Sequence, residues 1–167
     1  MDSKDSNVLK EEYLNSKDIR ERFKRLKLLV FDLPDDGKDF FLKAFNKERY
    51  LDAKLLALRG YAYYSTESEV ELLSGKILEL LKKREKTTPF NYEEYESMRS
   101  ALLLPYLVKK YGYDCFKELS SHLEKQYQRM PECFKGIFTL DEMGEYVSLR
   151  DNAEVKKSMD DYWNTRR

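Results

Sequence analysis

The sequence contains little glycine, proline or cysteine, and its charges cancel. Its 167 residues include 6 Gly, 4 Pro and 2 Cys, and 31 Lys and Arg residues balance 31 Asp and Glu residues. So few turn-forming residues argue against a β sandwich or barrel, which needs many tight turns. A zero net charge removes the simplest case for a nucleic-acid or membrane-surface binder, because such proteins carry a basic excess.

The chain also lacks long apolar runs and a recognisable leader. Its longest apolar stretches, residues 28–31 and 101–104, are far shorter than the roughly 20 residues that cross a membrane. The start, MDSKDSN, has no apolar segment of the kind found in secretory signals. Cys115 and Cys133 are too few for a disulfide framework, although a single bridge would suit a secreted chain. We therefore expect a soluble cytoplasmic protein without a membrane partner.

Motifs for catalysis and for metal or cofactor binding are missing too. The single histidine, His122, follows Cys115 by seven residues on one predicted helix, which separates them by roughly 10 Å. A Cys–His pair needs about 3 Å. The sequence has no CxxC or HxxxH spacing, phosphate loop, nucleophile elbow or dinucleotide fingerprint. We expect no catalytic residues, no metal and no cofactor, and an enzyme is the least favoured function.

What the sequence does contain is helical periodicity. Ile19, Phe23, Leu26 and Val30 follow the spacing i, i+4, i+7, i+11, which predicts one buried helix stripe that ends near Phe31. Later helices are predicted to start at capping residues. These starts are Asn46, Thr66 with Glu69, Asn91 with Glu94, Asp114, and Thr139 with Glu142.

Proline and glycine predict where these helices end. Pro105 should kink the helix that starts at Asn91 or end its first half, and Gly112 should terminate it. Pro131 should end the next helix, and Val147 is assigned to one or two final helices. We find no convincing alternation of period two. The prediction is a single all-α domain over residues 1–167, with residues 1–15 loosely ordered.

Two segments of the chain resemble each other at a distance of 45 residues. Residues 50–62 align with 95–107, so that Tyr50, Lys54, Leu58 and Tyr61 meet Tyr95, Arg99, Leu103 and Tyr106. With one extra residue, Val70, Leu73, Ser74 and Ile77 meet Phe116, Leu119, Ser120 and Leu123. The clearest units are residues 36–81 and 91–130. A period near 45 is typical of stacked helix pairs.

On these residues the chain resembles a HEAT/armadillo-like α-helical repeat. The segment FFLKAF, followed by NKERYLDAKLLALRGY, looks like a HEAT helix pair with a tight turn, and the resemblance covers about residues 36–130. It implies an all-α, right-handed solenoid of about four helical hairpins. An irregular helical bundle is the alternative.

The repeat places one Tyr–cation–Tyr stripe on each unit. Tyr and Arg are enriched at protein interfaces, because they offer large rigid area with a polar tip. Packing between repeats is the other interpretation of these tyrosines. We predict a non-catalytic adaptor, regulatory or toxin-neutralising module that binds a protein partner through this Tyr/basic face. Its predicted residues are Tyr50, Lys54, Tyr61, Tyr64, Tyr95, Arg99, Tyr106 and Lys109.

A basic helix over residues 17–27 provides the alternative function. Its cations Arg20, Arg22, Lys24 and Arg25 would contact nucleic acid, as HEAT-like glycosylases grip DNA on a basic face. An ordinary solvated helix face explains the same residues. An exposed Tyr-rich face could also pair with itself, so a homo-oligomer is a further option.

Overall fold

The described part of the chain is predominantly helical. The computed structural model describes residues 3–87, 95, 97–132, 138–140, 142, 146–148 and 152–166. The chain divides into two compact units, Met1–Ile77 and Leu78–Arg167. The prediction of a single domain stays a prediction. Within the described ranges, no helix combines the length and apolar character needed to cross a membrane.

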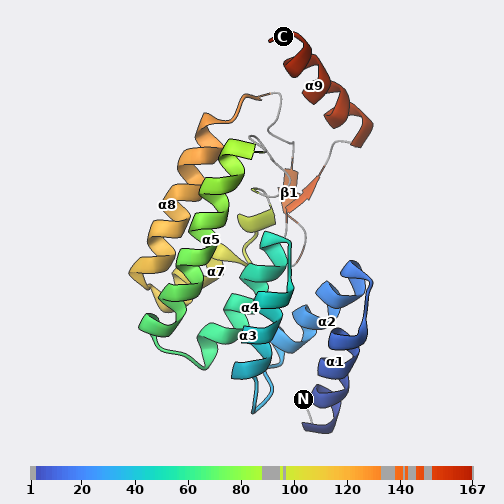
Figure 1. Ribbon diagram of the computed structural model, residues 1–167, viewed down its shortest axis with the longest axis vertical. Helices are drawn as coiled ribbons and strands as arrows, with labels where there is room; N and C mark the ends of the chain where they lie inside the picture. Colours follow the sequence, from blue (N-terminus) through green and yellow to red (C-terminus); the bar gives the residue numbers. More distant parts are fainter. Residues whose placement is uncertain are drawn as a thin grey trace. The chain divides into compact units, whose positions relative to one another are not determined.

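The first unit contains four helices and the first half of a fifth (Figure 1). They are α1 (Ser3–Asn15), α2 (Ile19–Phe31), α3 (Lys38–Lys47), α4 (Leu51–Tyr63) and the start of α5 (Glu67–Thr87). α1 packs against α2, α3 against α4, and α2 also contacts α4. Residues 3–15, expected to be loosely ordered, form α1, and Tyr13 anchors it with a fully buried side chain.

α4 is the centre of the first unit's core, because it is buried on nearly every face. All its residues from Leu55 to Ala62 are buried, as expected for a helix that is apolar all round. Gly60 allows the Phe41 ring of α3 to approach closely. A Cβ atom at Gly60 would lie 2.4 Å from Phe41 Cδ1. The small residue therefore sets how tightly α3 and α4 pack.

The described residues of the second unit form the end of α5, three further helices and a short hairpin (Figure 1). The helices are α7 (Leu104–Tyr111), α8 (Asp114–Arg129) and α9 (Asn152–Asn164). α7 packs against α8. The buried residues of this pair include Leu107 of α7 and Phe116, Leu119 and Leu123 of α8, and the three on α8 lie at helical spacing.

A two-stranded antiparallel hairpin corrects the sequence prediction for residues 138–148. β1 (Phe138–Leu140) pairs with β2 (Tyr146–Ser148), and Thr139 lies opposite Val147. Thr139 therefore opens no helix, and Val147 belongs to none. Aromatic and β-branched residues favour strands, but three residues are too few to reveal alternation of period two.

Helix starts were predicted with mixed success. The Thr66 capping box is confirmed, because the Thr66 backbone N–H donates to Glu69 Oε2 at 2.9 Å. Asn46 was wrong, since it lies inside α3 and α4 starts after Tyr50. Asp114 is the first residue of α8 rather than its cap. The predicted start at residues 91–94 falls outside the described residues.

Helix ends were predicted well. α2 ends at Phe31, and α8 ends just before Pro131. Pro105 lies in the first turn of α7, and the chain turns over residues 99–103 just before it, so no continuous helix runs through this region. Gly112 terminates α7 with a left-handed φ of 60°.

The predicted helical class is confirmed. Of the two predicted repeat helices, only the second, α5 aligned with α8, keeps its pattern of buried residues. Val70, Leu73 and Ile77 of α5 and their counterparts in α8 are all buried. α4, in contrast, is one continuous helix, and its counterpart at residues 95–107 contains the turn before Pro105. The two Tyr–cation–Tyr stripes therefore do not lie on equivalent continuous helices.

Candidate protein-interaction site

The first half of the Tyr/basic set is largely committed to the protein's own packing. Tyr61 is only 7% exposed, whereas Tyr50, which precedes α4, is 50% exposed. The Lys54 ammonium donates to the Phe45 carbonyl at 2.5 Å and lies 4.5 Å from the centre of the Phe45 ring. Its burial lowers the pKa of Lys54. Tyr50 is therefore the accessible member of this triplet.

Tyr64 holds the connection between α2 and α3. Its hydroxyl donates to the Pro34 carbonyl, and its ring stacks on Phe41. A Cβ atom at Gly37 would lie 2.7 Å from Tyr64 Oη, so a glycine is needed for this close approach. Burial above all, and then the neighbouring acidic groups, raise the pKa of Tyr64 to about 12. Its position indicates a structural role.

The second half of the set lies in the other unit. Tyr95 is only 6% exposed. Arg99 donates to Glu124 Oε1 at 3.0 Å, and its guanidinium lies 4.0 Å from the centre of the Tyr127 ring. Tyr106 is half-buried and Lys109 is exposed. The set is therefore divided between two units, and several of its members are enclosed by their own unit.

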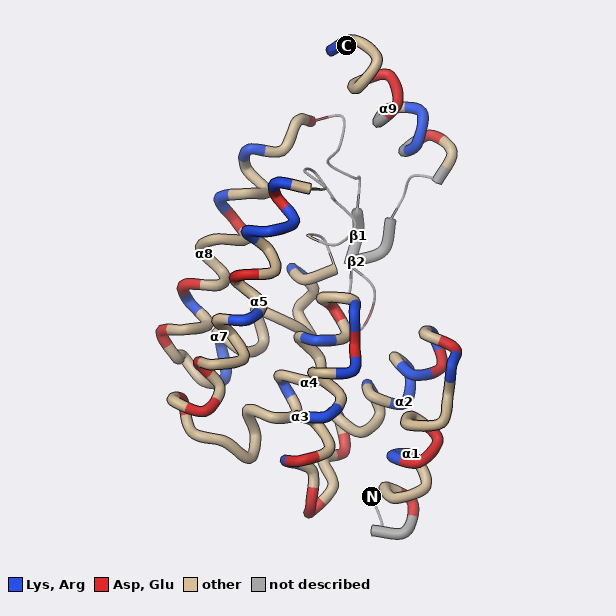
Figure 2. The backbone as a smooth tube through the Cα atoms, in the orientation of Figure 1, with Lys and Arg blue, Asp and Glu red and all other residues tan. Residues whose placement is uncertain are grey.

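The basic helix is α2, and two of its four predicted cations are held in ion pairs. Arg22 binds Glu48, and Arg25 binds both Glu12 at 2.9 Å and Glu21 at 2.5 Å. These carboxylates neutralise the guanidinium groups that would have to contact phosphates. Figure 2 shows both acidic and basic residues along α1 and mainly basic residues along α2. Arg20 and Lys24 remain exposed.

The Arg22–Glu48 pair belongs to a buried triad that joins three helices. Glu48, at the end of α3, is 3% exposed and accepts from Tyr13 Oη of α1 at 2.7 Å. Arg22 of α2 donates through Nε to Glu48 Oε1 at 3.0 Å and through Nη2 to Oε2 at 3.3 Å. Burial above all, then the bond to Glu48, raises the pKa of Tyr13, and Glu48 raises that of Arg22. These mutual bonds indicate a structural lock.

His122 is also engaged within the fold. Its Nε2 lies 2.5 Å from Oε1 of Glu85, so that the ring links α8 to the end of α5. Among the described residues no group of His, Cys, Asp and Glu could hold a metal ion. Cys115 is half-buried, while Cys133 falls in the part left undescribed.

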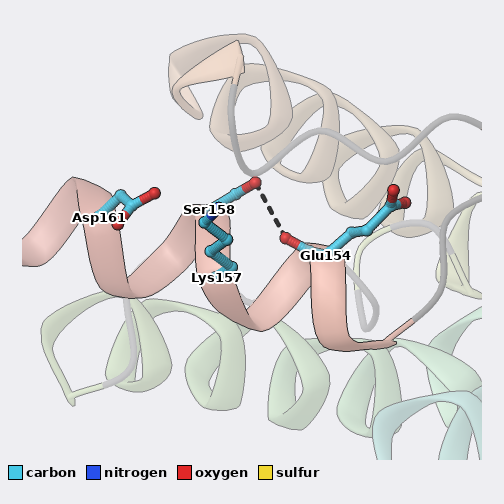
Figure 3. Close-up of a pocket in the computed structure, with 4 residues that line it drawn as sticks. All are labelled: Glu154, Lys157, Ser158 and Asp161. Atoms are coloured by element: carbon cyan, nitrogen blue, oxygen red, sulfur yellow. Dashed lines mark hydrogen bonds between the residues drawn. The ribbon is translucent and has the colours of Figure 1, made fainter.

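A depression beside α9 is lined by polar and charged side chains. Among the described residues, its lining consists of Glu154, Lys157, Ser158 and Asp161 of α9 (Figure 3). The Ser158 hydroxyl donates to the Glu154 carbonyl one turn earlier, at 3.0 Å. Since this serine donates to the backbone of its own helix, none of the described lining residues is an activated nucleophile.

The feature that sequence reasoning missed is a second face of α2. Leu26, Leu29 and Val30 form its buried face. Leu28 and Phe31, by contrast, are 47% and 45% exposed. They lie on the same side as three cations, since i, i+4, i+7, i+8 and i+11 share one helix face. This α2 stripe consists of Arg20, Lys24, Lys27, Leu28 and Phe31.

Comparison with known proteins adds no relative. No protein-family model matches the chain, and no curated protein or solved structure shows significant similarity to it.

Proposed function

We propose that this chain is a non-catalytic helical protein that binds another protein, as an adaptor, regulatory or toxin-neutralising module does. The observation that supports it is the group of large apolar side chains exposed on α1 and α2. Burial of such a side chain is worth about 1.5–3 kcal/mol, and neighbouring exposed apolar groups are typical of surfaces that a partner covers. The exposed residues are Val8, Leu14, Ile19, Leu28 and Phe31, of which Leu28 and Phe31 are neighbours three residues apart on one face of α2.

The finer proposal is that the helices form HEAT-like hairpins with a Tyr/basic face. The buried residues of α5 and α8, which keep the repeat spacing, support the hairpins. The exposure of Tyr50 in the first unit and of Lys109 in the second supports the inclusion of each in a binding surface of its own unit. Tyr61 and Tyr95 are expected to contribute to stability instead, because they are buried. The cytoplasmic location rests on the cysteine content and stays a prediction.

The test is affinity purification of the tagged full-length chain from cells that express it naturally, with nuclease treatment. The proposal predicts that a protein co-purifies and that the two purified components form a complex of fixed stoichiometry in size-exclusion chromatography. A chain that co-purifies with no protein, or whose captured protein fails to bind once purified, would contradict the proposal.

The nucleic-acid alternative predicts a different result from the same material. Binding through Arg20, Arg22, Lys24 and Arg25 would weaken steeply as salt rises, because bound counterions are released from the phosphates. Charge reversal at Arg22 would be a poor probe, since it also breaks the Glu48 pair. Arg20→Glu and Lys24→Glu change exposed side chains and serve instead.

A further inference from the structure

The α2 stripe combines charge of one sign with exposed apolar area. Arg20 and Lys24, toward the start of the helix, are exposed and cationic, and Leu28 and Phe31 form its apolar end. Glu21 flanks the stripe, but its carboxylate is 2.5 Å from Arg25 Nη1 on the neighbouring face. The stripe therefore presents a cationic half and an apolar half along one line.

The apolar end of the stripe contacts α4, which holds it in position. The Arg59 guanidinium of α4 lies 4.9 Å from the centre of the Phe31 ring, and Arg59 is itself buried. The opposite side of α2 is anchored in the core through Leu26, Leu29 and Val30. A partner would therefore meet a surface that needs little ordering, and low ordering cost favours affinity.

We propose that the α2 stripe is the docking site for an acidic amphipathic helix of another protein, a step that rests on the proposed function. Carboxylates of that helix would face Arg20 and Lys24, and its apolar residues would cover Leu28 and Phe31. Amphipathic helices bind apolar surfaces through such i, i+3, i+4 anchors. Charge complementarity at the cationic half sets the orientation and speeds association.

Charge also distinguishes this occupant from the alternatives. A second copy in parallel register would place Arg20 and Lys24 against their own equivalents, and an antiparallel copy that overlaps the whole stripe would place Lys24 against Lys27. Like charges at an interface are costly. Nucleic acid would use the cations but leave Leu28 and Phe31 uncovered. A partner segment rich in Asp, Glu and large apolar residues satisfies both halves.

Photo-crosslinking in the native cell tests the occupant. Benzoylphenylalanine is placed separately at Leu28, on the stripe, and at Leu72, an exposed position on α5 that serves as the control. The proposal predicts that position 28 crosslinks to an acidic helical segment of another protein and that position 72 does not. Crosslinks from position 28 to a second copy, to nucleic acid or to lipid would overturn it.

Affinity measurements then test the contacts, with a synthetic peptide of the crosslinked segment as the probe. We expect Leu28→Gln to weaken binding about tenfold. Lys24→Glu should weaken it and remove much of its salt dependence. The matched controls Leu72→Gln and Lys43→Glu change exposed residues on α5 and α3 and should bind like wild type. Equal losses in controls and stripe variants would refute the site.

The two proposals fail in different ways. Crosslinks to a partner protein from position 72 or from Tyr50, with none from position 28, would refute the α2 stripe and leave protein binding intact. A full set of positions that crosslinks to no protein would refute the proposed function itself. Circular dichroism of each variant before binding shows that it is folded, so a lost interaction is not lost structure.

Discussion

Replacement of Glu48 by methionine should destabilise the Met1–Ile77 unit more than any conservative change at its surface. The methionine keeps the length of the side chain but removes the carboxylate that accepts from Tyr13 and Arg22. The loss of one partner from a buried ion pair costs about 3–5 kcal/mol, because the other group stays buried without compensation. Glu48 is almost fully buried, so this range applies to it.

The other hydrogen bonds of Arg22 favour a cost at the lower end of that range. Its Nη1 also donates to the Lys17 carbonyl at 3.1 Å and to the Ser16 carbonyl at 3.4 Å. The guanidinium therefore keeps some partners when Glu48 is lost. We expect Glu48→Met to lower the free energy of unfolding by about 3 kcal/mol. Tyr13→Phe removes one hydrogen bond and leaves the ion pair intact, so it should cost about 1 kcal/mol.

Urea denaturation followed by far-ultraviolet circular dichroism measures both changes. The loss should appear as a lower urea midpoint than that of the wild-type protein. If Glu48→Met folds poorly, Glu48→Gln keeps one acceptor and should give an intermediate loss. Equal costs for Tyr13→Phe and Glu48→Met, or a loss under about 1 kcal/mol for the latter, would refute this reasoning.

Three further predictions concern packing and pH. Gly60→Ala should lower the free energy of unfolding by about 1–3 kcal/mol, because the new Cβ would overlap the Phe41 ring. Gly75→Ala, which has nothing within 4 Å of the new Cβ, should raise it by about 0.5–1 kcal/mol. Thermal unfolding compares the two variants. Burial raises the pKa of Tyr64 to about 12, so its stabilisation is present below the ordinary value of about 10 and is lost as pH rises toward 12; in an alkaline unfolding series, Tyr64→Phe should flatten that part of the curve. The Glu21 backbone N–H lowers the pKa of Asp18, so its stabilisation of α2 should be present above pH ~4 and lost as pH falls below it, and Asp18→Ala should remove this acid dependence.

The positions of several helices could be predicted from sequence because their determinants are local. The Thr66 capping box and Gly112 each act within one or two turns. The apolar spacing from Ile19 to Val30 located α2, but Ile19, expected on its buried stripe, is 45% exposed. Pro105 also acted locally, and the sequence allowed either a kink or an end at that point. The hairpin at residues 138–148 was missed, since pairing between distant short segments leaves little periodicity within either strand.

The candidate site was harder to predict, because burial depends on neighbours that the sequence does not specify. Tyr61 and Tyr50 have the spacing of one helix face, yet one is buried and the other half-exposed. α4 is surrounded on nearly all sides, so its tyrosines cannot be assigned to solvent from spacing alone. The partner of Arg22 was also unpredictable, since Glu48 lies 26 residues away on another helix.

The α2 stripe shows why a correct helix prediction can still hide a binding surface. A helix that buries Leu26, Leu29 and Val30 already satisfies the amphipathic pattern, so Leu28 and Phe31 attract no attention in a search for one apolar face. Their exposure becomes evident only when the buried face is known. Once the buried face is known, the cations that had suggested a solvated basic helix fall into two groups. Arg22 and Arg25 are held by carboxylates of their own unit, whereas Arg20 and Lys24 lie beside exposed apolar side chains. The charge of α2 is thus divided between stability on one side and, we propose, recognition on the other.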